Sequence, residues 1–164
     1  MSMGESGGSE LDYETMQARN WPSITQYSVF LENRVGQLLE IIRLFQGSKV
    51  RIVGLTISDS ADCSILRLIL SHPEQGREIL SLNKNAFAYN ELIVVELPAG
   101  PSSLVDVCAT LLQAEINIYY SYPLIVHPNG RAAMALHVDN IEQATSTLHT
   151  RGFEILTEAD LSAF

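Results

Sequence analysis

Residues 30–39, Phe-Leu-Glu-Asn-Arg-Val-Gly-Gln-Leu-Leu, have the types and spacing that best suit ligand chemistry. An alternating strand ends here, Asn33 is a favourable helix cap, and Gly36 lets the backbone come close to a ligand. The free N–H groups and the positive dipole end of a helix N-terminus attract a carboxylate. The pattern therefore indicates a carboxylate site. A simple cap at Asn33 and tight strand–helix packing at Gly36 would explain it equally well.

No other set of residues indicates catalysis or metal binding. Metal-ligand spacing with a third donor nearby is absent from the four histidines, which are His72, His127, His137 and His149. Cys108 falls on the predicted buried face of a helix, which indicates a packed thiol, and Cys63 has no base close in sequence. We therefore expect a protein that is not an enzyme, with no cofactor and no metal site.

The chain repeats its apolar pattern. With a shift of 66 residues, 27–31 fall on 93–97 and 50–52 fall on 116–118. Each repeat has the order strand, helix, strand, strand, helix, strand. This order predicts an α+β fold of two tandem ferredoxin-like β-α-β-β-α-β units, each an antiparallel sheet with its helices on one face.

The two units and their elements follow from this pattern. We expect a flexible acidic tail at 1–20, a first unit at 21–90 and a second unit at 91–164. In the first unit we expect a strand carrying Tyr27, Val29 and Leu31, a helix over 35–45, strands at 50–57 and 63–70, a helix from Pro73 and a short strand at 87–89. In the second unit we expect a strand at 92–97, a helix at 102–114, strands at 116–126 and 131–138, a helix at 141–150 and a strand at 153–157.

One face of each sheet needs a cover. Ile24, Phe30 and Tyr119 lie on the face opposite the predicted cores. Pairing of units, within the chain and between two chains, would cover this face, so we expect a homodimer. Two further tyrosines, Tyr120 and Tyr122, are predicted either to line a ligand pocket or to pack at a sheet interface.

Composition excludes several classes of protein. The net charge of −9 repels phosphate backbones, so we expect no nucleic-acid partner. No apolar run approaches the ~20 residues of a membrane span, and no signal-peptide core follows the start. With only two cysteines and no membrane association, the expected location is the cytoplasm. The charge divides into −3 for 1–20, +1 for 21–90 and −7 for 91–164, and this favours the first unit as host for a carboxylate.

The sequence resembles the ACT-domain family of amino-acid-binding regulatory modules. The family pattern is a strand, Asn or Asp, two residues, Gly, one residue and Leu, and residues 33–38 match it as Asn33, Arg34, Val35, Gly36, Gln37 and Leu38. The resemblance covers nearly all of 23–161 as two units and is closest to stand-alone bacterial proteins made of two such units.

The resemblance implies an effector site between adjacent units. The strand-to-helix loop of one unit would hold the amino acid, and the second-strand start of a neighbouring unit, often Val/Ile-Asn-Ile, would close the pocket. Ile116, Asn117 and Ile118 match that second pattern, whereas the first unit has Arg51 in place of Asn. The implied ligand-binding residues are therefore those of 33–38 together with Asn117 and Ile118.

The second loop departs from the family pattern. Ala99 replaces the Asn and Ser102 replaces the Gly, although Ser102 remains a good helix cap. We expect fewer effector sites than units.

The function implied is a non-catalytic regulator that binds a small amino-acid effector between ACT-like units. A second hypothesis is a regulatory or assembly subunit that docks onto a metabolic enzyme without a ligand.

Overall fold

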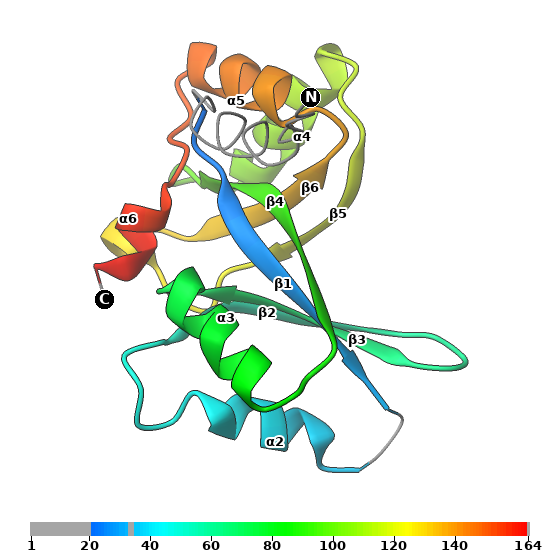
Figure 1. The fold of residues 1–164 in the computed structure, drawn as a ribbon. Coiled ribbons are helices and arrows are strands. Elements are labelled where there is room, and N and C mark those ends of the chain that lie inside the picture. The colour runs from blue at the N-terminus through cyan, green and yellow to red at the C-terminus, as the bar shows by residue number, and fades with distance from the viewer. Residues whose placement is uncertain (1–20, 33–34, 164) are drawn as a thin grey trace, which may run out of the picture.

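The computed structural model describes residues 21–32 and 35–163. Its strands form one six-stranded antiparallel sheet in the order β2-β3-β1-β4-β6-β5 (Figure 1). The strands are β1 (Ile24–Leu31), β2 (Ile52–Asp59), β3 (Ser64–Leu70), β4 (Phe87–Glu96), β5 (Ile118–Pro123) and β6 (Ala133–Val138). The helices are α2 (Gln37–Leu44), α3 (Pro73–Leu82), α4 (Ser103–Gln113), α5 (Ile141–Thr150) and α6 (Glu158–Ser162), and a 3₁₀ turn, η1, spans Pro128–Gly130. The predicted α+β fold of two ferredoxin-like units is confirmed.

Strand β4 belongs to both units. Residues 87–92 pair with β1, and residues 93–96 pair with β6. The sequence predicts two strands here, but no Pro or Gly interrupts 87–96, so nothing ends the extended backbone between them. The expected boundary between residues 90 and 91 lies inside this strand.

The end of the second unit differs from the prediction. The strand expected at 153–157 is reduced to one isolated bridge between Val95 and Ile155. A capping box follows at once, in which the Thr157 side chain accepts from Asp160 N and the Asp160 carboxylate accepts from Thr157 N. This pairing begins α6, a helix that the sequence analysis does not predict, and thereby ends the extended segment.

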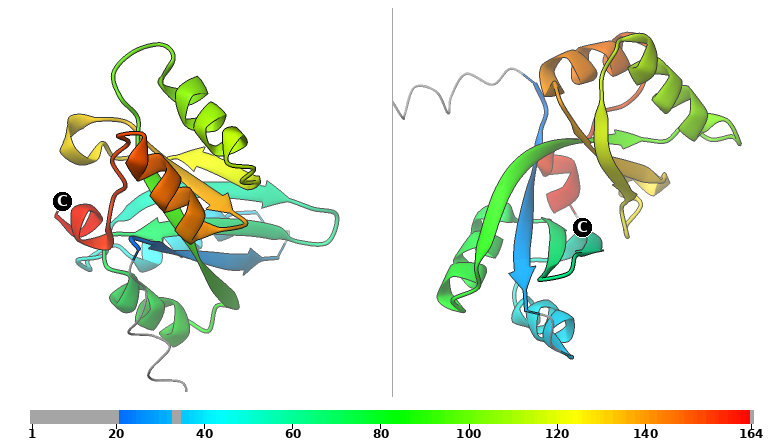
Figure 2. Two further views of the ribbon diagram at one scale, coloured as in Figure 1. Left: turned by 90° about the horizontal axis from the view of Figure 1, so that it is seen from above. Right: turned by 90° about the vertical axis from the view of Figure 1, so that its right-hand side faces the viewer.

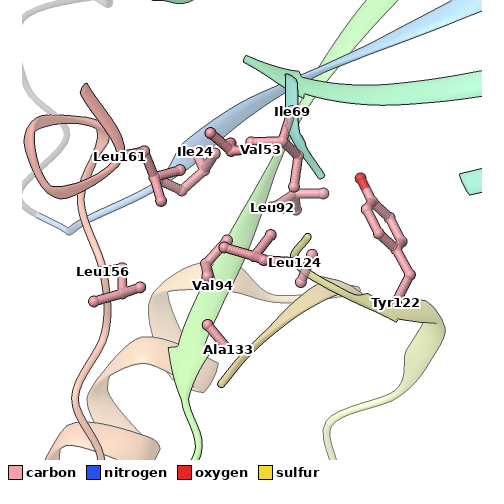
Figure 3. Close-up of a cluster of buried hydrophobic side chains, with 11 residues drawn as sticks. Ile24, Val53, Ile69, Leu92, Val94, Tyr122, Leu124, Ala133, Leu156 and Leu161 are labelled. Atoms are coloured by element: carbon pink, nitrogen blue, oxygen red, sulfur yellow. The ribbon is translucent and has the colours of Figure 1, made fainter. Parts of the chain in front are cut away.

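Apolar side chains form three clusters. One lies between the first unit's sheet and α2 and α3, and another lies between the second unit's sheet and α4 and α5. Figures 1 and 2 show the two helix pairs at opposite ends of the molecule with the strands between them. The third cluster, drawn in Figure 3, fills the space between the two halves of the sheet and is closed at one side by Leu156 and Leu161. Full burial of each large aliphatic side chain stabilises the fold by about 1.5–3 kcal/mol.

The third cluster covers part of the sheet face that the sequence predicted to be open. Ile24 is only 1% exposed, as expected for pairing of units within the chain. Phe30 and Tyr119 remain 45% and 58% exposed. Intrachain pairing therefore covers one part of this face and leaves another part in solvent.

The sheet curls until its two outer strands touch. Gly54 of β2 forms an antiparallel bridge with Leu124, just beyond β5, and Ile125 N donates to Val53 O at 2.9 Å. A Cβ atom on Gly54 would lie 3.1 Å from methyl carbons of both Ile69 and Leu124. Glycine therefore allows the close approach of these strands without displacing the two side chains.

Across residues 21–32 and 35–163, every helix is too short or too polar to traverse a bilayer.

Candidate functional site

The start of α2 is built around Gly36. This residue is the N-cap of the helix and has φ 85°, a left-handed conformation that glycine adopts without strain. Among the described residues other than its two chain neighbours, none has a heavy atom within 4 Å of the position that a Cβ would occupy, so contact with them is not the reason for glycine here. The helix begins at Gln37, two residues later than predicted. The left-handed backbone at Gly36 therefore explains the glycine. Val35 and Gly36, at the start of the helix, are exposed to solvent.

The neighbours of Gly36 divide between solvent and core. Val35 is fully exposed, whereas Leu38 packs against the core of the first unit. The side-chain oxygen of Gln37 is buried and has no hydrogen-bond partner in the described part of the chain. Asn33 and Arg34 lie outside the described residues, so their predicted roles stay predictions. The first-turn N–H groups of a helix have no intrahelical acceptors, which makes this end suitable for a carboxylate.

The start of β5 has the alternation that its sequence predicts. Ile116 is buried and Ile118 packs against the second core, while Asn117 is exposed. Backbone bonds fix this segment, since Asn117 N donates to Asp139 Oδ1 at 3.2 Å and Asp139 N donates to Asn117 O at 3.1 Å. The side chain of Asn117 is thus presented on a fixed backbone at the outer side of the strand.

One chain does not bring the two predicted halves of the effector site together. Helix α2 lies at one end of the molecule, and the start of β5, next to the C-terminus of α4, lies towards the other (Figures 1 and 2). Their side chains belong to separate apolar clusters. Gly36, at the start of α2, and the start of β5 therefore lie apart within one chain.

The second loop has a different local structure. Gly100 has φ 127°, and Ser102 is the N-cap of α4 without a side-chain bond to the backbone. The Ser102 hydroxyl donates to Asp106 Oδ2 at 3.3 Å. Ser102 is thus the N-cap residue as expected, but its side chain makes no capping bond, because its backbone (φ −95°, ψ −1°) is helical rather than extended.

Sequence reasoning missed a polar cluster between the two units, to which strands far apart in the sequence contribute. Gln26 is fully buried, and its Nε2 donates to Asn90 Oδ1 at 2.9 Å and to the Tyr120 hydroxyl at 2.7 Å. The Tyr122 hydroxyl donates to Gln26 Oε1. The Arg67 guanidinium lies 4.2 Å from the centre of the Tyr120 ring. In the sequence, this cluster is indicated by a polar residue, Gln26, on the strand face opposite the predicted core.

Burial dominates the electrostatics of this cluster. It raises the pKa of the Tyr122 hydroxyl. Burial, and secondly the positive charge of Arg67, lower the pKa of His137, whose ring lies against Tyr119 and Tyr120. Tyr120 and Tyr122 therefore pack at an interface between units, which was one of the two predictions made for them.

The remaining chemical side chains are scattered. Cys108 is exposed, so the prediction of a packed thiol is wrong: on α4 the buried positions are Val107, Thr110 and Leu111, and Cys108 faces outwards. Within the described parts of the chain, no three His, Cys, Asp or Glu residues are grouped to hold a metal ion.

The fold and the glycine-capped helix start define a protein of paired ferredoxin-like units. Residues 22–164 match the family described as ACT domain pair, and the chain belongs to this family. Members of this family are regulatory, amino-acid-binding domains rather than catalytic ones.

Solved structures agree with this assignment. Protein BT0572 from Bacteroides thetaiotaomicron is similar, with a TM-score of 0.80 and 26% identity over 89% of this chain and 100% of that chain. The regulatory subunit of aspartate kinase from Thermus thermophilus, in its ligand-free form, has a TM-score of 0.54 and 9% identity over 80% and 93%. The corresponding subunit from Thermus flavus has a TM-score of 0.51 and 7% identity over the same shares. The last two likenesses concern the fold alone. No curated protein sequence matches this chain.

Proposed function

We propose that this protein is a regulator that binds a small amino acid between two copies of the chain. The observation that carries the proposal is the open, glycine-capped start of α2 in an ACT domain pair. Loop 33–36 of one copy would hold the carboxylate, and Asn117 of the other copy would close the site with its amide.

Exposed apolar residues support a geometry for this pairing. Val35 just before α2 and Leu39 on α2 are exposed, and Val105 and Leu112 are exposed on α4. If α2 of one copy packs antiparallel to α4 of the other, these side chains bury one another. The same arrangement brings the N-terminus of α2 next to the C-terminus of α4. Asn117 follows that end closely, because Ile116 N donates to Leu111 O at 3.0 Å.

A calorimetric titration with each free amino acid tests this proposal. We expect one effector per chain, because the second loop lacks the features of the first. Asn117→Ala should weaken binding about tenfold or more, the scale of one lost bond to a charged group. The matched control is Arg51→Ala, which changes the equivalent exposed position of the first unit and should leave the affinity unchanged.

Two results would contradict the proposal. Equal binding at two sites per chain would mean that the second loop, at residues 99–102, binds an effector as well as the first loop does. The absence of binding by every amino acid would favour the alternative function, a ligand-independent subunit that docks onto an enzyme.

A further inference from the structure

The sheet face that encloses Gln26 is open to solvent towards the end of β1. The next residues of β1 on this face are Ser28 and Phe30, which pair with Arg67 and Ile65 of β3. Phe30 is 45% exposed, and the other three are half-buried. Figures 1 and 2 show the hairpin of β2 and β3 projecting beyond the other strands at this end of the sheet.

The two outer strands of the sheet part at this open end. Among the described residues, β2 and β5 are joined by the one isolated bridge between Gly54 and Leu124. Residues 56–59 of β2 lie beyond that bridge and have β3 as their neighbour on one side only. An unpaired strand edge of this kind is a surface to which an extended peptide adds by main-chain hydrogen bonds.

Arg67 occupies the gap between these two strands. Its guanidinium donates to the Ser58 hydroxyl of β2, and it lies 4.2 Å from the centre of the Tyr120 ring of β5. Beside Tyr120 lie the rings of His137 and Tyr119, and Tyr119 is 58% exposed. The gap is therefore bordered by an arginine and by aromatic rings that solvent reaches.

The charge of Arg67 is not balanced within the chain. No carboxylate of the described residues forms an ion pair with it. The strand residues around it on this face are uncharged, namely Ser28, Thr56, Ser58, Ile65, Asn90 and Tyr120. A half-buried charge is ordinarily paired, so this position favours an anionic group from outside the chain.

We infer that the gap between residues 56–59 of β2 and Tyr120 of β5 docks an extended acidic segment of a partner protein. The backbone of the segment adds to the edge of β2, and one of its carboxylates pairs with Arg67. A second copy of the chain, paired there about a two-fold axis, would bring its own Arg67 to the same edge, so charge favours an acidic partner. The inference stands independently of the proposed amino-acid site, because it uses neither loop 33–36 nor Asn117.

Fluorescence anisotropy with a labelled peptide, in which three glutamates alternate with valines, tests the inference on the full chain. We expect saturable binding with a dissociation constant below about 100 μM. A peptide with glutamine in place of each glutamate should bind about tenfold more weakly. Because the protein carries a net charge of −9, a preference for the acidic peptide cannot arise from overall charge.

Two arginine variants locate the binding. Arg67→Met removes the charge but keeps a long side chain, and it should weaken binding of the acidic peptide about tenfold and abolish its advantage over the glutamine peptide. Arg77→Met is the matched control, because the Arg77 guanidinium also lies over a tyrosine ring, 5.5 Å from the centre of Tyr89, on the opposite face of the sheet. It should bind as the wild type does.

The peptide itself tests pairing with the strand edge. Of two forms that are N-methylated at alternate residues, one should no longer bind, because only alternate amides of an added strand face β2. Equal binding by both forms would overturn the inference. The comparison of acidic and glutamine peptides on the wild type needs no protein variant, so it stays decisive if Arg67→Met does not fold.

Three further results would also overturn the inference. They are an absence of saturable binding up to about 1 mM acidic peptide, equal affinity of the wild type for the acidic and glutamine peptides, and equal affinity of Arg67→Met and Arg77→Met. A fall in the mass of the protein on addition of peptide, measured by light scattering, would show that a second copy occupies the edge instead. Asn117→Ala should bind the peptide unchanged, so failure of the proposed function and failure of this inference are distinguishable.

Discussion

At the scale of single residues, the interface between the units depends on a buried amide. Gln26 is inaccessible to solvent, and it is acceptable there because Asn90, Tyr120 and Tyr122 satisfy both ends of its side chain. A fully satisfied polar network of this kind fixes how the strands are arranged, whereas a partly satisfied one destabilises the fold.

Replacing Gln26 by Leu should lower the free energy of unfolding by about 1–3 kcal/mol, because the buried Tyr122 hydroxyl then loses its acceptor. Adding Tyr122→Phe to that variant should recover part of the loss. Urea denaturation of the wild type, both single variants and the double variant measures the coupling. Strictly additive effects of the two substitutions would contradict the assigned hydrogen bond.

His137 predicts a pH dependence of stability. Burial and the nearby Arg67 charge hold its pKa below the ordinary value of 6.5, so the unfolded state binds a proton at a higher pH than the folded state. Its contribution is therefore fully present above about pH 6.5 and is lost as the pH falls below that value. His137→Gln should flatten the stability curve between about pH 7 and 5, whereas His127→Gln, at an exposed position, should not. Identical curves for the two variants would contradict the assignment.

At the scale of elements, the chain joins two small units by sharing a strand and by closing a sheet. Each unit alone has few strands and a limited core, and β4 makes them continuous. The bridge between Gly54 and Leu124 then brings the outer strands together over the third apolar cluster. Because β2 and β5 are the outer strands of the sheet, this contact depends on how tightly their backbones can approach.

Gly54→Val should destabilise the protein by about 1–3 kcal/mol, the usual cost of overpacking, because the new side chain meets Ile69 and Leu124. Thermal unfolding followed by circular dichroism measures the effect. Ser121→Val, at an exposed position on β5, adds apolar bulk on the solvent side and should be nearly neutral. If both variants melted together with the wild type, the closure would not limit stability.

At the scale of the whole molecule, corresponding helices of the two units carry exposed apolar residues. Leu39 of α2 and Val105 of α4 occupy equivalent repeat positions, and both remain exposed in the single chain. A two-fold dimer in which α2 and α4 exchange partners would cover both sets at once.

Leu39→Glu should convert the proposed dimer to a monomer, because the interface cannot bury an unpaired carboxylate. The matched control is Leu82→Glu, since Leu82 of α3 is 81% exposed and lies outside the proposed helix pair. Light scattering after size exclusion gives the mass of each variant. A monomeric wild type at about 10 μM, or equal masses for both variants, would count against the helix pairing.

Much of the fold follows from the sequence because local pattern and local structure agree in both repeats. Pro73 begins α3 as predicted, and Asn140 caps α5, which spans the predicted residues 141–150. The errors occur where local signals compete with long-range pairing. The strand at 153–157 gives way to the Thr157 capping box, and Cys108 is rotated out of the core by less than one helical turn.

The sequence by itself determined the two ferredoxin-like units, the family pattern and the glycine at the start of α2, because hydrophobic period and backbone conformation are local properties. Only the tertiary structure decided that the units share β4 and that their sheet faces enclose Gln26. It also placed the start of α2 and the start of β5 towards opposite ends of the molecule. These outcomes depend on how strands distant in sequence pack together, and no local pattern encodes that packing.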